Sequence, residues 1–197
     1  MRLKEQTGLS QAELPLDGLK EHLRLGSGFG EETLQDTVLE AALRAAIAAI
    51  ESRTGKVLIE RSFIWQTEAW RQCDAQAFPV APVVSLSWMK LVTRTGEEVA
   101  VDLETVALEP STQRPVLRSV YGRLPSIPAY GYAEIGFAAG YAPDWDALPA
   151  DLARAVMILA AHFYESRDGS SEDGLPAGVT RLIERYRTVR ILGGSAA

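Results

Sequence analysis

The spacing of apolar residues changes twice along this chain, and these changes constrain the fold more than any other feature. Between Glu31 and Thr54, apolar side chains recur every three or four residues, which predicts a long amphipathic helix. Its main apolar stripe consists of Leu39, Leu43, Ala46 and Ile50, with Leu34, Val38, Ala42 and Ala45 beside it. So wide an apolar face predicts a helix that is packed on more than one side.

After Gly55 the apolar residues alternate, which is typical of strands with one buried face. We expect strands, mostly in antiparallel pairs, at 56–65, 82–93, 99–103, 105–110, 115–120 and 132–140. Helical spacing returns at 148–167 and at 179–192. The predicted fold class is therefore α+β: a small helical bundle, built from N- and C-terminal helices, with an inserted and mostly antiparallel β module.

The same pattern divides the chain into three consecutive units. Residues 1–55 hold the N-terminal helices, residues 56–140 the β module, and residues 141–197 the C-terminal helices and a tail. The first unit includes a short helix at 16–25, for which Asp17 is the expected cap. The start of the chain lacks a signal peptide's apolar region, and no apolar run approaches the roughly 20 residues of a membrane span, so we expect no membrane association.

The stretch AHFYESRDG, residues 161–169, contains the side chains that acid–base or nucleophilic chemistry would use. Glu165 and Asp168 could form a carboxylate pair, which keeps a carboxylate-dependent hydrolase as an alternative. However, catalytic carboxylate pairs usually come from separate elements that face a cleft. These two residues lie three apart at a predicted helix end, so we expect no catalytic residue here.

Residue types and spacing also argue against a metal site or a cofactor. Cys73 is the only cysteine, and His22 and His162 are the only histidines, so the chain cannot form a three-histidine or cysteine-based zinc site. The stretch GSGFG at 26–30 does not match the glycine pattern of dinucleotide-binding loops. The acidic residues Glu31 and Glu32 after it would repel a phosphate.

Charge is distributed unevenly along the chain. The net charge is −6, yet the residues from Val179 onward contain four arginines and one glutamate, which gives +3 there and leaves −9 for the rest. An acidic body disfavours tight binding of nucleic acid, and a basic tail on such a body suggests a docking segment. A DNA-binding regulatory helical protein that reads DNA through 181–190 is the other alternative.

Five segments follow one another in a characteristic order between about Leu16 and Leu192. They are LKEHLRL, AIESRTGKVLIERSF, FPVAPVVSLSWMKLV followed by the turn TGEEV, EIGFAAGYAPDWDALPADLARAVMILAAHFYESRDG, and LPAGVTRLIERYRTVRIL. In this order the chain resembles the head–tail connector (adaptor or head-completion) proteins of long-tailed phages. The stretch GSGFG makes it more similar to the gene transfer agent branch of that family.

This resemblance implies a structural protein with no enzymatic activity and no cofactor. Such adaptors form a homo-oligomeric ring, dodecameric in this family, between the portal protein and a stopper or tail-side protein. DNA would pass through the ring without specific binding. The expected location is a virion or phage-like particle that assembles in the cytoplasm.

The resemblance also implies that the C-terminal segment contacts the portal protein. The expected interface residues are Arg185, Arg187, Arg190, Ile191 and Leu192. Leu182, Tyr186 and Val189 would hold the last helix on its own bundle. The arginines would meet portal carboxylates, while Ile191 and Leu192 would fill an apolar groove.

Overall fold

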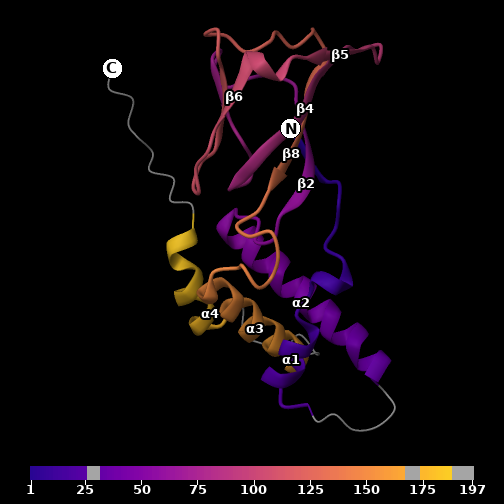
Figure 1. Ribbon diagram of the computed structural model, residues 1–197, viewed down its shortest axis with the longest axis vertical. Helices are drawn as coiled ribbons and strands as arrows, with labels where there is room; N and C mark the ends of the chain where they lie inside the picture. Colours follow the sequence, from indigo (N-terminus) through magenta and orange to yellow (C-terminus); the bar gives the residue numbers. More distant parts are fainter. Residues whose placement is uncertain (26–31, 167–173, 188–197) are drawn as a thin grey trace.

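The computed structural model describes residues 1–25, 32–166 and 174–187, and it places the helices at one end of the molecule and the sheets at the other (Figure 1). The helical end contains α1 (Leu16–His22), α2 (Glu32–Thr54), α3 (Ala150–Glu165) and α4 (Ala177–Ile183). Helix α1 begins after Pro15, and Asp17 lies in its first turn with its side chain 98% exposed, so the prediction that Asp17 caps this helix is wrong.

The other end, the β end, contains two antiparallel sheets. One sheet has the order β1-β2-β8-β4-β5 and consists of β1 (Arg2–Glu5), β2 (Arg61–Thr67), β8 (Tyr132–Ala139), β4 (Val83–Val92) and β5 (Glu98–Val101). The second has the order β3-β7-β6 and consists of β3 (Ala75–Ala77), β7 (Val116–Ser119) and β6 (Val106–Glu109). These helices and sheets confirm the predicted α+β class.

Three strands differ from the sequence expectation. Strands β1 and β3 are not predicted, because three or four residues are too few for an alternating pattern to be recognised. Strand β2 begins at Arg61 instead of residue 56. The residues before it form only single parallel bridges, Lys56 with Ala81 and Ile59 with Ala142, because the chain there runs between the two ends of the molecule.

Each end has its own hydrophobic core. In the helical core the predicted stripe of α2 is confirmed, since Leu39, Leu43, Ala46 and Ile50 are all fully buried. The second stripe is narrower than predicted: Val38 and Ala45 are exposed, while Ile47 is buried instead. The reason is that α1 and α3 cover one side of α2 and leave the opposite side to solvent.

The β core lies between the two sheets, and aromatic rings dominate it. Phe63, Trp65 and Phe137 project from the five-stranded sheet, while Leu117 projects from the three-stranded sheet. The ring of Phe78 contacts Phe137 edge-on with their centroids 5.1 Å apart, and it lies 5.4 Å from Trp65. Such aromatic pairs stabilise a core beyond the area that they bury.

The chain passes from one core to the other between Thr54 and Arg61. Gly55 adopts the left-handed conformation (φ 70°) that ends α2. Val57 then joins the β core, whereas Leu58 and Ile59, the next two residues, join the helical core. We call residues 54–61 the joint.

An ion pair holds the joint together. Arg61 donates from Nη2 to both carboxylate oxygens of Glu51 at 2.6 Å, and from Nη1 to Glu5 at 3.0 Å. Glu51 also accepts the backbone N–H of Leu58 at 2.8 Å. Burial raises the pKa of the Glu51 carboxyl, and the Arg61 guanidinium offsets part of this rise. The pair thus connects α2, β2 and β1 in a largely dry setting.

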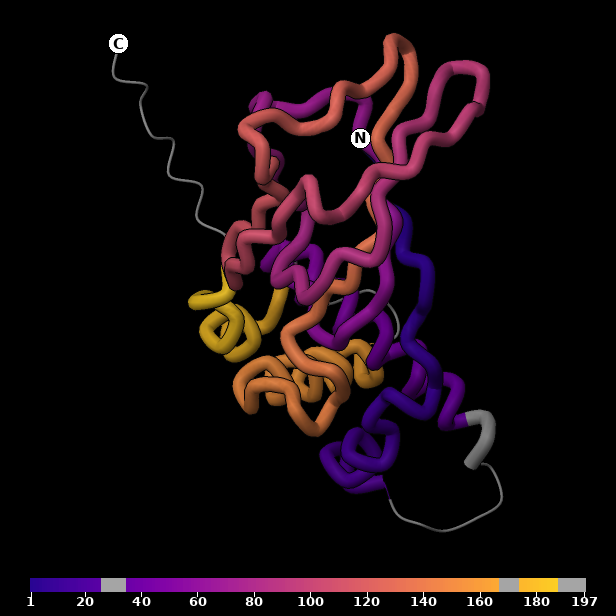
Figure 2. Tube along the Cα trace, turned by 45° about the horizontal axis from the view of Figure 1, so that its top comes forward, coloured from indigo at the N-terminus to yellow at the C-terminus, as the bar shows by residue number. Residues whose placement is uncertain are grey.

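A buried lysine ties the joint to the loop between β6 and β7. Lys56 is only 1% exposed, and its Nζ donates to the Gln113 side-chain oxygen at 3.0 Å and to the Gln113 carbonyl at 3.2 Å. Burial lowers the pKa of the Lys56 amine. The loop that carries Gln113 reaches down toward α4 (Figure 2), and Figure 1 agrees, so part of the β end lies beside the last helix.

We expect Arg61→Ala to lower the free energy of unfolding by about 3 kcal/mol, because it leaves the buried Glu51 carboxylate without its partner. The unpaired carboxyl will have a folded-state pKa further above its unfolded value, so the lost stability returns as the pH falls and Glu51 becomes protonated. Urea unfolding between pH 4.5 and pH 8 measures both effects. The matched control is Arg187→Ala, which breaks a surface pair and should cost less than about 1 kcal/mol. An equal loss in both variants would contradict the role of the joint.

Candidate functional site

The last helix is shorter than the sequence predicts. Instead of running over 179–192, α4 ends at Ile183 and a 3₁₀ turn, η3 (Glu184–Tyr186), follows it. At Arg187 the backbone is extended (φ −63°, ψ 133°). In a 3₁₀ turn, side chains three residues apart lie on the same face, so Tyr186 follows Ile183 into the helical core.

This change of helix type also alters the predicted apolar stripe. The buried side chains are Val179, Ile183 and Tyr186, whereas Leu182 is only partly buried. Val189 lies outside the described residues. The prediction that this stripe holds the last helix on its own bundle is therefore confirmed for Tyr186, with Ile183 in the place given to Leu182.

Tyr186 anchors the end of η3 by contacts with Asp151 and Tyr141. Its side chain is 6% exposed, and its hydroxyl donates to Asp151 Oδ1 at 2.7 Å. Its ring meets the ring of Tyr141 at 90°, with the centroids 5.4 Å apart. Asp151 also accepts the backbone N–H of Leu152 in the first turn of α3. The base of the C-terminal segment is thus fastened to α3 and to the loop that follows β8.

Arg185 belongs to the same cluster. Its guanidinium forms an ion pair with Asp151 Oδ2 at 2.8 Å, lies 4.7 Å from the centre of the Tyr186 ring and donates to the Tyr186 hydroxyl. The side chain nevertheless remains 69% exposed. Arg185 therefore helps to hold the segment while still presenting positive charge to a partner.

The other predicted interface residues are placed differently. Arg187 forms a surface ion pair with Glu184 at 3.0 Å. Arg190, Ile191 and Leu192 lie outside the described residues. The structure therefore brings only Arg185 into the anchoring cluster. Asp151 and Tyr141, which complete the cluster, were missed by sequence reasoning, because no spacing relates them to a residue more than 30 positions away.

The residues of the possible catalytic stretch do not come together as a site. Glu165 is exposed at the end of α3, and Asp168 lies outside the described residues, as does the stretch GSGFG. His162 contacts the neighbouring Phe163 ring at 6.3 Å between centroids. Within the described ranges, no group of three or more His, Cys, Asp or Glu side chains is arranged to hold a metal ion. None of the described helices is both long and apolar enough to cross a membrane.

Three solved structures are similar to the whole chain, and in each case the match covers 98% of this chain and 99% of the other. They come from the neck of an empty gene transfer agent (GTA) particle computed with C6 symmetry (45% identity, TM-score 0.90), the virion of a native GTA particle (45%, 0.87) and the neck of a native GTA particle computed with C12 symmetry (43%, 0.86).

No protein-family model and no curated protein matches the sequence. The similarity to the solved particle structures is nevertheless high enough to establish the family. The chain belongs to the head–tail connector proteins of gene transfer agents, which are structural proteins of a phage-like particle. The resemblance that the sequence suggests is confirmed, and neither alternative, the DNA-binding regulator or the hydrolase, is supported.

We expect Tyr186→Phe to cost about 1.5 kcal/mol at pH 7, because the ring packing is kept and the hydrogen bond to the Asp151 carboxylate is lost. Burial raises the pKa of Tyr186 above its ordinary value of 10.0. The neutral hydroxyl is thus favoured in the folded state, and its contribution is present below about pH 10 and is lost as the pH rises further. Denaturant unfolding of the native chain and of Tyr186→Phe should show a smaller difference in the free energy of unfolding at pH 10.5 than at pH 7. The control is Tyr130→Phe at a residue that is 90% exposed, and an equal effect there would contradict the anchor.

Proposed function

We propose that this protein is a non-enzymatic adaptor of the particle neck. Twelve copies form a ring that binds the portal protein on one side and a stopper or tail-side protein on the other, and the ring encloses the path of the DNA. Glu165 and Asp168 take part in no chemical step. The single observation that carries the proposal is the match, over 98% of the chain, to proteins in solved GTA necks, one of them computed with C12 symmetry.

The C-terminal segment, Arg185 to Leu192, is the proposed contact with the portal protein. Its base is held at a defined place on the surface by Tyr186, so Arg187 follows from a fixed point at the helical end. Arg187 and Arg190 would meet portal carboxylates. The surface pair of Arg187 with Glu184 is weak enough to be exchanged for such a partner. Burial of Ile191 and Leu192 in an apolar groove would add roughly 1.5–3 kcal/mol each.

The charge of the rest of the chain supports a DNA conduit. Outside the basic tail the chain carries a net charge of −9. A wall of that sign repels phosphates, so DNA can move past it without being held.

We expect a chain truncated after Tyr186 to fold normally, because the anchor and the helical core are intact, yet to fail to co-sediment with portal rings. Circular dichroism and thermal unfolding check the fold, and sedimentation with purified portal rings checks the binding. The matched control is a chain truncated after Leu192, which loses only GGSAA and should bind like the full chain. If truncation after Tyr186 leaves the binding unchanged, the docking site lies elsewhere, first of all in the loop between β6 and β7 beside α4.

Particle images test the adaptor role itself. Particles from cells that lack this protein should have no ring of density below the portal, and supplying the full chain should restore it. A neck with an unchanged ring in the absence of this protein would contradict the proposal.

A further inference from the structure

One face of the five-stranded sheet is open to solvent. Side chains alternate along β2 and β8, so Phe63, Trp65 and Phe137 point into the β core while their neighbours point to the opposite side. On that opposite side Ile64, Gln66 and Trp88 are all partly exposed. We call the surface formed by Arg2, Lys4, Ile64, Gln66, Trp88 and Glu134 the open sheet face.

A polar row crosses four strands of this face. The register places Arg2 opposite Gln66, Gln66 opposite Glu134, and Glu134 opposite Lys90. Glu134 accepts a hydrogen bond from Gln66 and forms an ion pair with Lys90 at 3.0 Å. At the β1 end, Arg2 and Lys4 are exposed, and no carboxylate of the described residues lies within ion-pair distance of either. The row is thus neutralised in its middle and positive at its β1 end.

The adjacent row is mostly apolar. In this row the strand register places Lys4 opposite Ile64, Ile64 opposite Gly136, and Gly136 opposite Trp88. The Trp88 indole lies across Gly136, since a Cβ added there would be 2.4 Å from two of its ring atoms. A hollow of about 200 Å³, lined by Arg2, Lys4, Ile64, Gln66 and Glu134, lies beside this row. The exposed part of the Trp88 ring, the hollow beside it and the cations Arg2 and Lys4 together form a surface suited to a protein partner.

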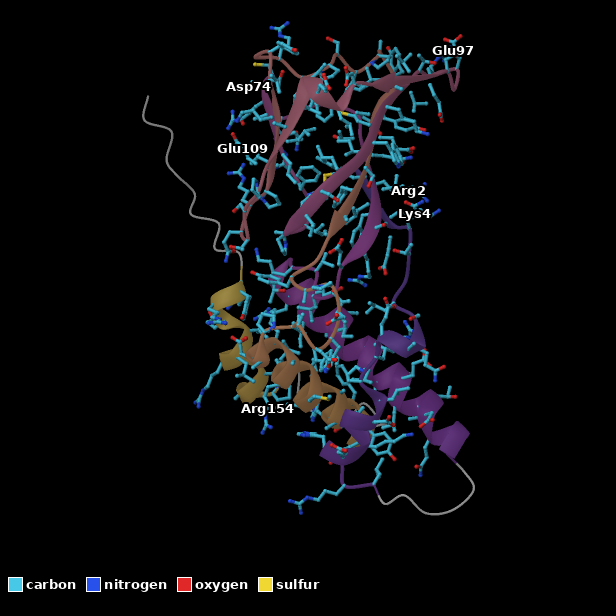
Figure 3. All side chains as sticks on the ribbon, viewed as in Figure 1. Arg2, Lys4, Asp74, Glu97, Glu109 and Arg154 are labelled. Carbon is cyan, nitrogen blue, oxygen red and sulfur yellow. The ribbon has the colours of Figure 1, made fainter. Side chains whose placement is uncertain are left out.

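The opposite side of the β end carries acidic groups. Asp74 and Glu109 lie on the side of the molecule away from Arg2 and Lys4 (Figure 3). Both carboxylates pair with the single guanidinium of Arg118, at 3.3 Å and 2.5 Å, so the cluster has a net negative charge. We call the surface around Asp74 and Glu109 the acidic side.

We infer that the open sheet face of one copy binds the acidic side of the next copy around the ring. This inference rests on the proposed ring, because a closed ring requires two different and complementary surfaces on each subunit. Arg2 and Lys4, which have no carboxylate partner among the described residues, supply the positive charge that Arg118 alone does not provide for the two carboxylates of Asp74 and Glu109. The β ends would therefore form a continuous belt around the channel.

DNA is a poorer occupant of the open sheet face. Binding to phosphates needs clustered cations, because affinity grows with the number of phosphates that are neutralised. Among the described cations of this face, Arg2 and Lys4 are the two without an ion pair, and they lie next to Glu134, which lines the same hollow, and near Glu5 at the end of β1. The mixed charge fits another protein surface better than a polyanion.

Crosslinking between subunits tests the inference, since the native Cys73 is exposed directly before Asp74 and provides a thiol on the acidic side. We expect Lys4→Cys, treated with a short bismaleimide in assembled particles, to give a ladder of linked subunits. Peptide mass spectrometry should join position 4 of one copy to Cys73 of another. The matched control is Arg154→Cys, an exposed position on α3 at the helical end (Figure 3), which should give no ladder with Cys73.

A charge exchange provides a second readout that does not depend on crosslinking geometry. Replacing Arg2 and Lys4 by Glu should abolish the ring while leaving the thermal unfolding of the monomer unchanged, because neither side chain forms an ion pair with another described residue. Adding Asp74→Lys and Glu109→Lys to that variant should restore the ring.

The outcomes separate this inference from the proposed function. Ring density without a link between position 4 and Cys73, together with charge reversal that leaves the ring intact, overturns the inference and leaves the adaptor role standing. A link from position 4 to DNA or to a different neck protein also overturns it. Necks without any ring contributed by this protein overturn both.

Discussion

The buried ion pair between Glu51 and Arg61 connects the two ends of this protein. It joins the last turns of α2 to the first residue of β2, and through Glu5 it also reaches β1. Because the pair is mostly buried, removing one partner leaves a charge that water solvates poorly, which is why its loss should be costly. Lys56 forms a second connection at the joint, because its amine donates to Gln113 in the loop between β6 and β7.

The same connection places the two proposed interfaces in a fixed relation. The C-terminal segment starts from the helical end, where Tyr186 is bound to Asp151 on α3 and packed against Tyr141 after β8. The open sheet face and the acidic side belong to the β end. If the joint holds both ends at one angle, contact with the portal protein and contact between neighbouring copies support each other. A subunit that docks by its tail then presents its sheets in the orientation that the next subunit needs.

The longest patterns in the sequence predict their elements best. The apolar stripe of α2 and the strand-like runs of β4 and β8 each extend over eight or more residues. The failures are local and have physical causes. Asp17 has a side chain suited to capping a helix, but Pro15 holds the capping position and Asp17 lies within the first turn of α1. The apolar spacing at 179–192 is helical, but α4 ends at Ile183 and Tyr186 is buried by the 3₁₀ turn that follows it.

The sequence by itself determined the α+β class, the order of helices and strands and the membership of the connector family, because these depend on periodicity and on the order of segments along the chain. Only the tertiary structure decided that Glu51 pairs with Arg61, that Asp151 and Tyr141 receive Tyr186, and that Arg2 comes to lie in one row with Gln66 and Glu134. Most of these partners are far apart in the chain, and even Glu51 and Arg61 meet only because the joint folds back on itself. Their proximity follows from strand register and helix packing, which local side-chain spacing does not encode.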